Sequence, residues 1–125
     1  MLMSELIFVY GSLRRGASNH FRMKDSEYLG CAQIKGTLIK VDWYPGLLLE
    51  GDSWIHGEVY QVEESTLREL DAFEGVGSQN SEYQRIHHEV LLNQQPTKVW
   101  VYEWLGGVLD YEILASGDWL LHESD

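Results

Sequence analysis

The sequence feature that most constrains this chain is a run of five apolar residues that ends abruptly at a glycine. Residues 6–10 are all leucine, β-branched or aromatic, and Gly11 and Ser12 follow them directly. An unbroken run of this kind predicts a strand that is buried on both faces. Gly11 permits a sharp turn or a close approach to the backbone, and the turn leaves N–H groups and one hydroxyl free. The segment is therefore either an ordinary first strand and turn or one wall of a small-molecule site.

The length and composition predict a single globular domain. The chain has 125 residues, of which 44% are hydrophobic and 23% are charged. These fractions are ordinary for a globular protein, and the length is enough to bury one core. We therefore expect one domain over residues 1–125.

Charge, hydrophobic runs and cysteine content indicate which partners and which cellular compartment to expect. A net charge of −11 repels phosphate backbones and no lysine and arginine stripe offsets it, so we expect no nucleic-acid partner. No apolar run approaches the roughly 18 residues of a spanning helix, and the N-terminus carries Glu5 without a basic region, so we expect no membrane span and no signal peptide. Cys31 is the only cysteine, which excludes an internal disulfide and fits a cytoplasmic protein. Its apolar neighbours predict a packed thiol rather than a nucleophile. We expect a monomer or a weak dimer.

Hydrophobic periodicity predicts about six short strands and one helix. The expected strands span residues 6–10, 34–41, 47–50, 54–62, 83–92 and 97–104. Residues 63–73 change period, because Leu67, Leu70 and Phe73 recur every three residues behind an acidic first turn. This pattern predicts a helix, and Gly75 is well placed to end it.

The remaining segments predict turns and loops. Turns are expected at residues 42–46 and 51–52, and a hairpin connection at residues 93–96. Residues 14–28 are predicted to form a loop with a short helical turn, and residues 110–119 to close the chain. Together the elements predict a β-rich α+β domain, in which closure of the sheet into a small barrel would protect its edge strands.

The spacing of polar residues excludes several kinds of site. His87 and His88 are adjacent on a predicted strand, so their side chains leave opposite faces and cannot share a metal ion. The sequence has no HExxH motif and no cysteine pair, and we expect no metal. Ser12 does not lie in a G-x-S-x-G elbow, and the residues after Gly11 lack the GK[ST] of a P-loop.

Glu74 is the acid–base candidate that the residues themselves indicate. It lies at the end of the predicted helix, where the negative end of the helix dipole disfavours another negative charge. Phe73 precedes it and a Gly-Val-Gly loop follows, so partial loss of solvent would raise its pKa. Such a carboxyl suits general acid–base chemistry at neutral pH. The alternative is an ordinary solvated glutamate at a helix end.

Six segments of the chain, in order, resemble one known family. They are VYGSLRRG at residues 9–16 together with Asn19, YPGL at 44–47, GEVY at 57–60, LDAFEG at 70–75, YQR at 83–85 and SGDW at 116–119. No single segment is specific, but their order and spacing are. The chain therefore resembles the γ-glutamylcyclotransferase-like proteins from about residue 6 to residue 119.

The resemblance implies a fold and a reaction. The fold is a small, mostly antiparallel β-barrel of about six strands with flanking helices, in agreement with the α+β class read from periodicity. In the reaction, the α-amine of a γ-glutamyl compound attacks its own γ-carbonyl, expels an amine or amino acid and leaves 5-oxoproline. No water, metal or cofactor takes part in this cyclisation.

The resemblance also implies which residues form the site. Glu74 matches the family's catalytic position and would move the proton from the attacking amine to the leaving nitrogen. Backbone N–H groups in the turn would stabilise charge on the carbonyl oxygen. The residues implied to bind substrate are Tyr10, Gly11, Ser12, Leu13, Asn19, Tyr83 and, by a looser similarity, Tyr111. Arg14, Arg15 and Asn19 either bind a substrate carboxylate or are simply solvated.

Two functions remain open at this point. The first is a γ-glutamyl cyclotransferase acting on a γ-glutamyl amino acid or a γ-glutamyl amine, with Glu74 as general acid and base. The second is a non-catalytic barrel that keeps the pocket and binds a small molecule or a partner. The presence of Glu74 favours the enzyme, because a pure binder has no need of a carboxylate at that position.

Overall fold

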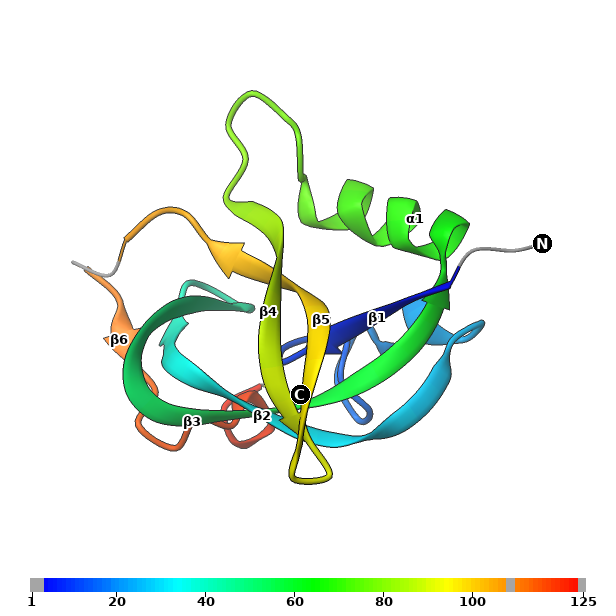
Figure 1. Cartoon of the computed structure of the whole chain (residues 1–125). Helices are drawn as coiled ribbons and strands as arrows, with labels where there is room; N and C mark the ends of the chain where they lie inside the picture. The colour runs from blue at the N-terminus through cyan, green and yellow to red at the C-terminus, as the bar shows by residue number, and fades with distance from the viewer. Residues whose placement is uncertain (1–3, 108–109, 124–125) are drawn as a thin grey trace.

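The structure, a computed structural model, describes residues 4–107 and 110–123 (Figure 1). Within these residues it contains six strands, one α-helix and two short 3-10 helices. In chain order they are β1 (Ser4–Val9), η1 (His20–Met23), β2 (Glu27–Lys40), β3 (Pro45–Glu63), α1 (Glu64–Glu74), β4 (Tyr83–Leu92), β5 (Gln95–Trp104), β6 (Glu112–Ile113) and η2 (Trp119–Leu121). The expected α+β class is confirmed.

The strands form one sheet that closes on itself. Their order is β3-β1-β5-β4-β2-β6, and β3 also pairs with β2, so the first five strands make a ring. Every pairing is antiparallel except that of β1 with β5, where Ile7 lies opposite Trp100. The expectation of a mostly antiparallel sheet of about six strands is therefore confirmed. The α-helix α1 packs beside β1 and β3 (Figure 1).

The elements with strong local signals lie where the sequence predicts them. The helix predicted over residues 63–73 is α1, and it ends at Gly75, whose φ of 72° is the left-handed conformation of a helix C-cap. The strand predicted over residues 83–92 is β4. Its hairpin to β5 turns at Asn93 and Gln94, whose φ values of 49° and 69° are typical of a two-residue type I′ turn.

The turn predicted at residues 51–52 is wrong, because β3 runs through it as one long strand. The register against β2 passes from Gly36 opposite Ser53 directly to Thr37 opposite Leu48, so residues 49–52 bulge out of the ladder. Gly51, with φ of 114°, lies in this bulge. Gly51 does mark a local change of backbone direction, but that change is a bulge within β3 and not the end of a strand.

Two other predictions need correction. β2 begins at Glu27, earlier than residue 34, because the irregular register near Gly30 hides its first half from a pattern of strict alternation. Cys31 is exposed rather than packed, because the buried side of β2 at this point holds Ala32 and Ile34. The segment over residues 110–119, for which no element was predicted, contains β6 and the start of η2.

The core has two parts, one on each side of the first strand. Phe8 belongs to a cluster to which strands all round the ring contribute, whereas Ile7 and Val9 belong to a second cluster that includes Leu67 and Leu70 of α1. Phe8 and Ile7 are both 0% exposed. The prediction that the first strand is buried on both faces is therefore confirmed. Among the described helices, none has the length and apolar character needed to cross a membrane.

Candidate functional site

A pocket of about 220 Å³ opens where β1 ends, next to the last turn of α1. Five separate segments of the chain meet there. Its lining consists of Phe8, Val9, Tyr10, Gly11, Ser12, Leu13, Trp43, Tyr44, Pro45, Phe73, Glu74, Glu82, Tyr83 and Tyr102. The end of the first strand is thus one wall of a concave site, as small-molecule sites commonly are.

The turn after β1 lines the pocket and contains backbone N–H groups without a partner among the described residues. The N–H of Arg14 donates to the carbonyl oxygen of Gly11 at 3.0 Å, which closes the turn. The N–H groups of Gly11, Ser12 and Leu13 donate no hydrogen bond to another residue in the described ranges. A Cβ on Gly11 would lie 2.7 Å from Cγ of Pro45, so only glycine lets the turn pack this closely. These three N–H groups are available to a ligand.

Glu74, the last residue of α1, brings a carboxyl with a raised pKa into the pocket. Its side chain is partly buried, and loss of solvent, together with the nearby negative charge of Glu82, raises its pKa from 4.5 to about 7. The positive charge of Arg22 opposes this rise. Near neutral pH the carboxyl therefore exists in both forms, and it is able to accept a proton and to return it.

Three tyrosine hydroxyls around the pocket already donate their protons. Tyr10 donates to the carbonyl oxygen of Tyr102 at 2.6 Å, and Tyr83 to that of Pro45 at 2.5 Å. Tyr44 donates to the Glu82 carboxylate at 3.0 Å. Burial raises the pKa of all three, that of Tyr44 to about 12, so they stay neutral. Their oxygens can therefore act only as acceptors, which suits a ligand that carries a protonated amine.

The end of α1 is fastened to the sheet by one carboxylate. Asp71 accepts two hydrogen bonds from Arg85 of β4, at 2.7 and 2.9 Å, and a third from the Tyr102 hydroxyl of β5, at 2.8 Å. A bidentate arginine pair fixes geometry as well as adding energy. Since Glu74 follows Asp71 by three residues, this network sets the position of the pocket carboxyl.

Most of the predicted site residues lie together. The pocket lining includes Glu74, Tyr10, Gly11, Ser12, Leu13 and Tyr83. Asn19 and Tyr111 are outside the lining. Asn19 supports it instead, because its N–H donates to the carbonyl oxygen of Ser12 at 2.8 Å. The ring of Tyr111 packs edge-on against Trp104, with 5.7 Å between the ring centroids.

Sequence reasoning missed several lining residues. Trp43, Glu82 and Tyr102 line the pocket, but they are not among the site residues that the sequence predicts. Tyr102 lies on a predicted strand. The alternation of side chains along that strand assigns Tyr102 to one face of the sheet, but it does not show which residues lie opposite that face. Glu82 lies in a loop without a distinctive pattern, and only its neighbour Tyr83 was named.

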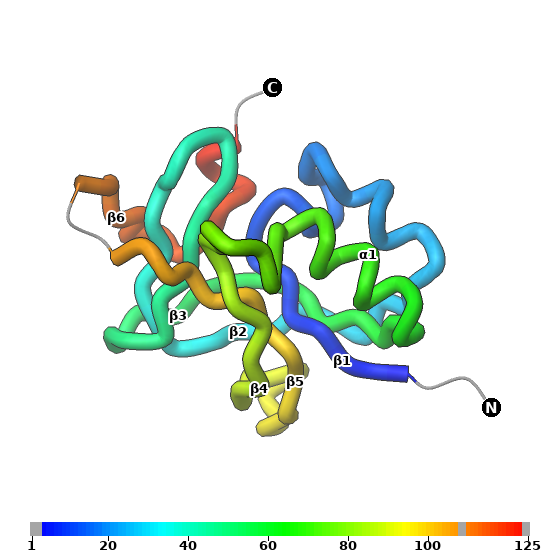
Figure 2. Tube along the Cα trace, turned by 90° about the horizontal axis from the view of Figure 1, so that it is seen from above, coloured from blue at the N-terminus to red at the C-terminus, as the bar shows by residue number. Residues whose placement is uncertain are grey.

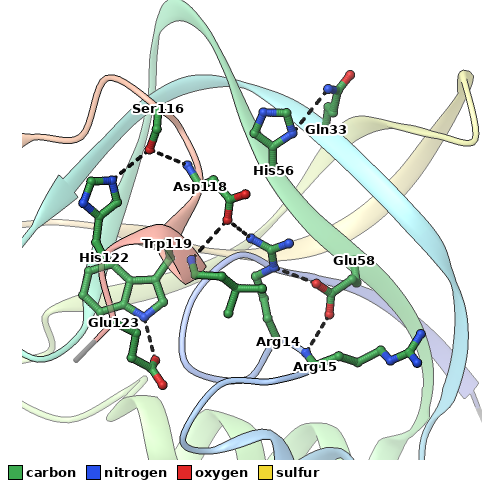
Figure 3. A network of polar contacts seen from close by, with 11 residues as sticks. Arg14, Arg15, Gln33, His56, Glu58, Ser116, Asp118, Trp119, His122 and Glu123 are labelled. Atoms are coloured by element: carbon green, nitrogen blue, oxygen red, sulfur yellow. Dashed lines mark hydrogen bonds and ion pairs between the residues drawn. The ribbon is translucent and has the colours of Figure 1, made fainter. Parts of the chain in front are cut away.

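Arg14 differs from both alternatives predicted for it, whereas Arg15 is exposed, as one of its two alternatives expects. Figure 3 shows the contacts of Arg14 and Arg15. Arg14 is buried and forms ion pairs with Glu58 at 2.6 Å and with Asp118 at 2.7 Å. It is therefore neither a substrate-binding residue of the pocket nor a solvated arginine. Arg15 is exposed, and its guanidinium lies 4.7 Å from the centre of the Tyr28 ring, away from the pocket lining.

Acidic and histidine side chains do not gather into a metal site in the described residues. Across residues 4–107 and 110–123, no three His, Cys, Asp or Glu side chains are grouped so that they could hold an ion.

Known proteins resemble this chain in sequence and in fold. The profile of a family described as gamma-glutamyl cyclotransferase, AIG2-like, matches residues 7–121. A Vibrio cholerae protein provisionally named a gamma-glutamylcyclotransferase is 39% identical over 119 residues, which cover 94% of this chain and 96% of that protein. A Niallia circulans protein named gamma-L-glutamyl-butirosin B gamma-glutamyl cyclotransferase is 42% identical over 89 residues, which cover 67% of this chain and 56% of that protein. The crystal structure of an AIG2-like protein from Mus musculus matches with a TM-score of 0.77 at 27% identity, covering 92% of this chain and 87% of that one. The chain belongs to the gamma-glutamyl cyclotransferase, AIG2-like family.

Proposed function

We propose that this protein converts a γ-glutamyl amino acid or a γ-glutamyl amine into 5-oxoproline and a free amine, with Glu74 as general acid and base. The observation that carries the proposal is the position of Glu74: a carboxyl with a pKa of about 7 shares one small pocket with a turn of free N–H groups. The family to which the chain belongs supports this class of reaction.

The reaction needs one group that both takes and gives a proton. The α-amine of the substrate arrives mainly as an ammonium, and Glu74 in its ionised form removes a proton from it. The free amine attacks the γ-carbonyl carbon, and the new C–N bond closes a five-membered ring. The old C–N bond then breaks, and the leaving nitrogen receives this proton from Glu74. The ring nitrogen still carries one proton more than the amide of 5-oxoproline, and Glu74 passes that second proton to the released amine, which leaves as an ammonium. No atom is gained or lost overall, and Glu74 returns to its ionised form.

The other pocket groups suit the same reaction. The N–H groups of Gly11, Ser12 and Leu13 are candidates for stabilising the negative charge that develops on the carbonyl oxygen. The phenol oxygens of Tyr10 and Tyr83 are candidates for accepting hydrogen bonds from the substrate ammonium. Because the nucleophile belongs to the substrate, holding it folded toward its own carbonyl is a large part of the catalysis.

A panel assay tests the proposal. The protein is incubated with γ-glutamyl amino acids and γ-glutamyl amines, and 5-oxoproline is quantified beside the uncatalysed reaction. Loss of the acid–base group in Glu74→Gln should lower kcat by about 100-fold to 10,000-fold. Glu69→Gln, which changes an exposed glutamate on the same helix, is the matched control and should keep full activity.

Three outcomes have different meanings. Turnover that falls in Glu74→Gln alone supports both the reaction and the base. Turnover that survives in Glu74→Gln and falls in Glu82→Gln would transfer the role of base to the second pocket carboxylate. No 5-oxoproline above the uncatalysed rate across the panel would reject the proposed enzyme and leave a binding protein that has kept the pocket.

A further inference from the structure

Arg22 lies beside the pocket on a segment that the fold holds in place. The next residue, Met23, is 2% exposed and packs in the core cluster beneath α1. At the other end of η1, the N–H of Asn19 donates to the carbonyl oxygen of Ser12 in the pocket turn. The chain on both sides of Arg22 is therefore fixed to the core and to the site. Figure 2 shows the segment that contains η1 alongside α1.

Two aromatic rings hold the Arg22 guanidinium near the pocket. Its central carbon lies 4.0 Å from the centre of the Phe73 ring and 4.9 Å from that of the Phe21 ring. Phe73 lines the pocket and directly precedes Glu74. The charge of Arg22 is close enough to lower the pKa of Glu74. The stacking therefore presents a fixed positive charge at the wall that carries the carboxyl.

Arg22 has no carboxylate partner among the residues that the structure describes. The ion pairs found there engage Arg14, Arg68 and Arg85. The polar contact of Arg22 is a hydrogen bond of 3.3 Å from Nε to Oδ1 of Asn19. Stacking on a ring leaves the donors in the guanidinium plane free, so both terminal nitrogen groups remain available. This is the arrangement of a carboxylate receptor whose partner is not part of the protein.

The charge of the pocket gives such a receptor a purpose. Glu74 and Glu82 both line it, and they repel any leaving group that carries its own carboxylate. An amino acid leaving group has that carboxylate one carbon away from the nitrogen that leaves, whereas a simple amine has none. A cation at the wall offsets the repulsion for the first kind of substrate and offers nothing to the second.

We propose that Arg22 binds the carboxylate of the leaving group, so that the protein prefers γ-glutamyl amino acids to γ-glutamyl amines. The inference rests on the proposed cyclotransferase reaction. It adds to that reaction a residue that reads the half of the substrate that is released.

A matched pair of substrates tests this role. γ-Glutamyl-alanine and γ-glutamyl-ethylamide differ only by the carboxylate of the leaving group. Rates are compared at an alkaline pH at which Glu74 is ionised in every variant, because removal of Arg22 also raises its pKa. Arg22→Gln should lose roughly tenfold in kcat/KM on γ-glutamyl-alanine and remain within about twofold on γ-glutamyl-ethylamide. Arg15→Gln, a second exposed arginine away from the pocket, should change neither value. An equal loss on both substrates, or no loss on either, would overturn the inference.

A binding measurement separates this inference from the proposed reaction. In the Glu74→Gln background, calorimetry should give a dissociation constant roughly tenfold lower for γ-glutamyl-alanine than for γ-glutamyl-ethylamide. Adding Arg22→Gln should remove that difference. If the wild-type protein formed no 5-oxoproline, the proposed reaction would fail, and this binding preference would still decide the role of Arg22. A preference that persists without Arg22, or no preference at all, would reject the inference by itself.

Discussion

Replacement of Glu74 by glutamine should stabilise the folded protein at alkaline pH. The carboxyl titrates near 4.5 when it is fully solvated and near 7 in the fold, because burial disfavours its charged form. Between these two pH values the folded state binds more protons than the unfolded state. Stability therefore falls as the pH rises from 4.5 to about 7, and the loss is complete above that range. Glutamine has nearly the same shape and no charge to bury.

The size of the effect follows from the pKa of Glu74. A rise from 4.5 to about 7, at about 1.4 kcal/mol for each pKa unit, corresponds to about 3 kcal/mol. This is an upper value, because solvent reaches part of the side chain and screens its charge. Below pH 4.5 the carboxyl is protonated in both states, so the variant and the wild type should be equally stable there.

Urea unfolding of the wild type and Glu74→Gln at the two ends of this pH range measures the difference. Glu69→Gln provides the control, and its exposed carboxyl should give no difference at either pH. A stability gain in Glu74→Gln that is absent above pH 7, or that is equally large below pH 4.5, would refute the reasoning. The same titration predicts that kcat/KM falls as the pH drops below about 7, since the proposed base must be ionised.

Three further changes test the parts of the structure that support the site. Arg85→Gln removes both hydrogen bonds of 2.7 and 2.9 Å to Asp71, and urea unfolding should show a loss of about 2 kcal/mol together with a lower kcat, because the end of α1 is no longer fixed. Gly11→Ala places a Cβ 2.7 Å from Pro45, and thermal unfolding should show a loss of about 1–3 kcal/mol. Cys31→Ser changes an exposed thiol. The free energy of unfolding in urea should stay within about 0.5 kcal/mol of the wild-type value, and kcat should stay within about twofold.

The parts of the fold that were predictable are those with local causes. The helix over residues 64–74 announces itself through Leu67 and Leu70 on one face and Gly75 after its end. The continuous apolar run of β1 correctly indicated burial on both sides. By contrast, the bulge at Gly51 could not be told from a turn, because the difference depends on where Gly36 and Thr37 of another strand lie. Register between strands is set by partners that a single sequence does not reveal.

The arginines also show which features the sequence reveals and which depend on distant parts of the chain, and these arginines matter for function. With 20 acidic residues against nine lysines and arginines, almost any arginine in this chain has many carboxylates to choose from. Arg14, in the segment after the glycine turn, is a candidate anion-binding residue from the sequence. In the structure its guanidinium pairs with Glu58 and Asp118, which are 44 and 104 residues away in the chain. Arg22 is not a candidate from the sequence, because no motif marks it. Only the folded chain shows that Arg22 is held against Phe73 beside the Glu74 carboxyl, without a carboxylate partner in the described residues. In so acidic a protein, a fixed arginine left without such a partner beside the pocket is best explained by an anion that arrives with the substrate.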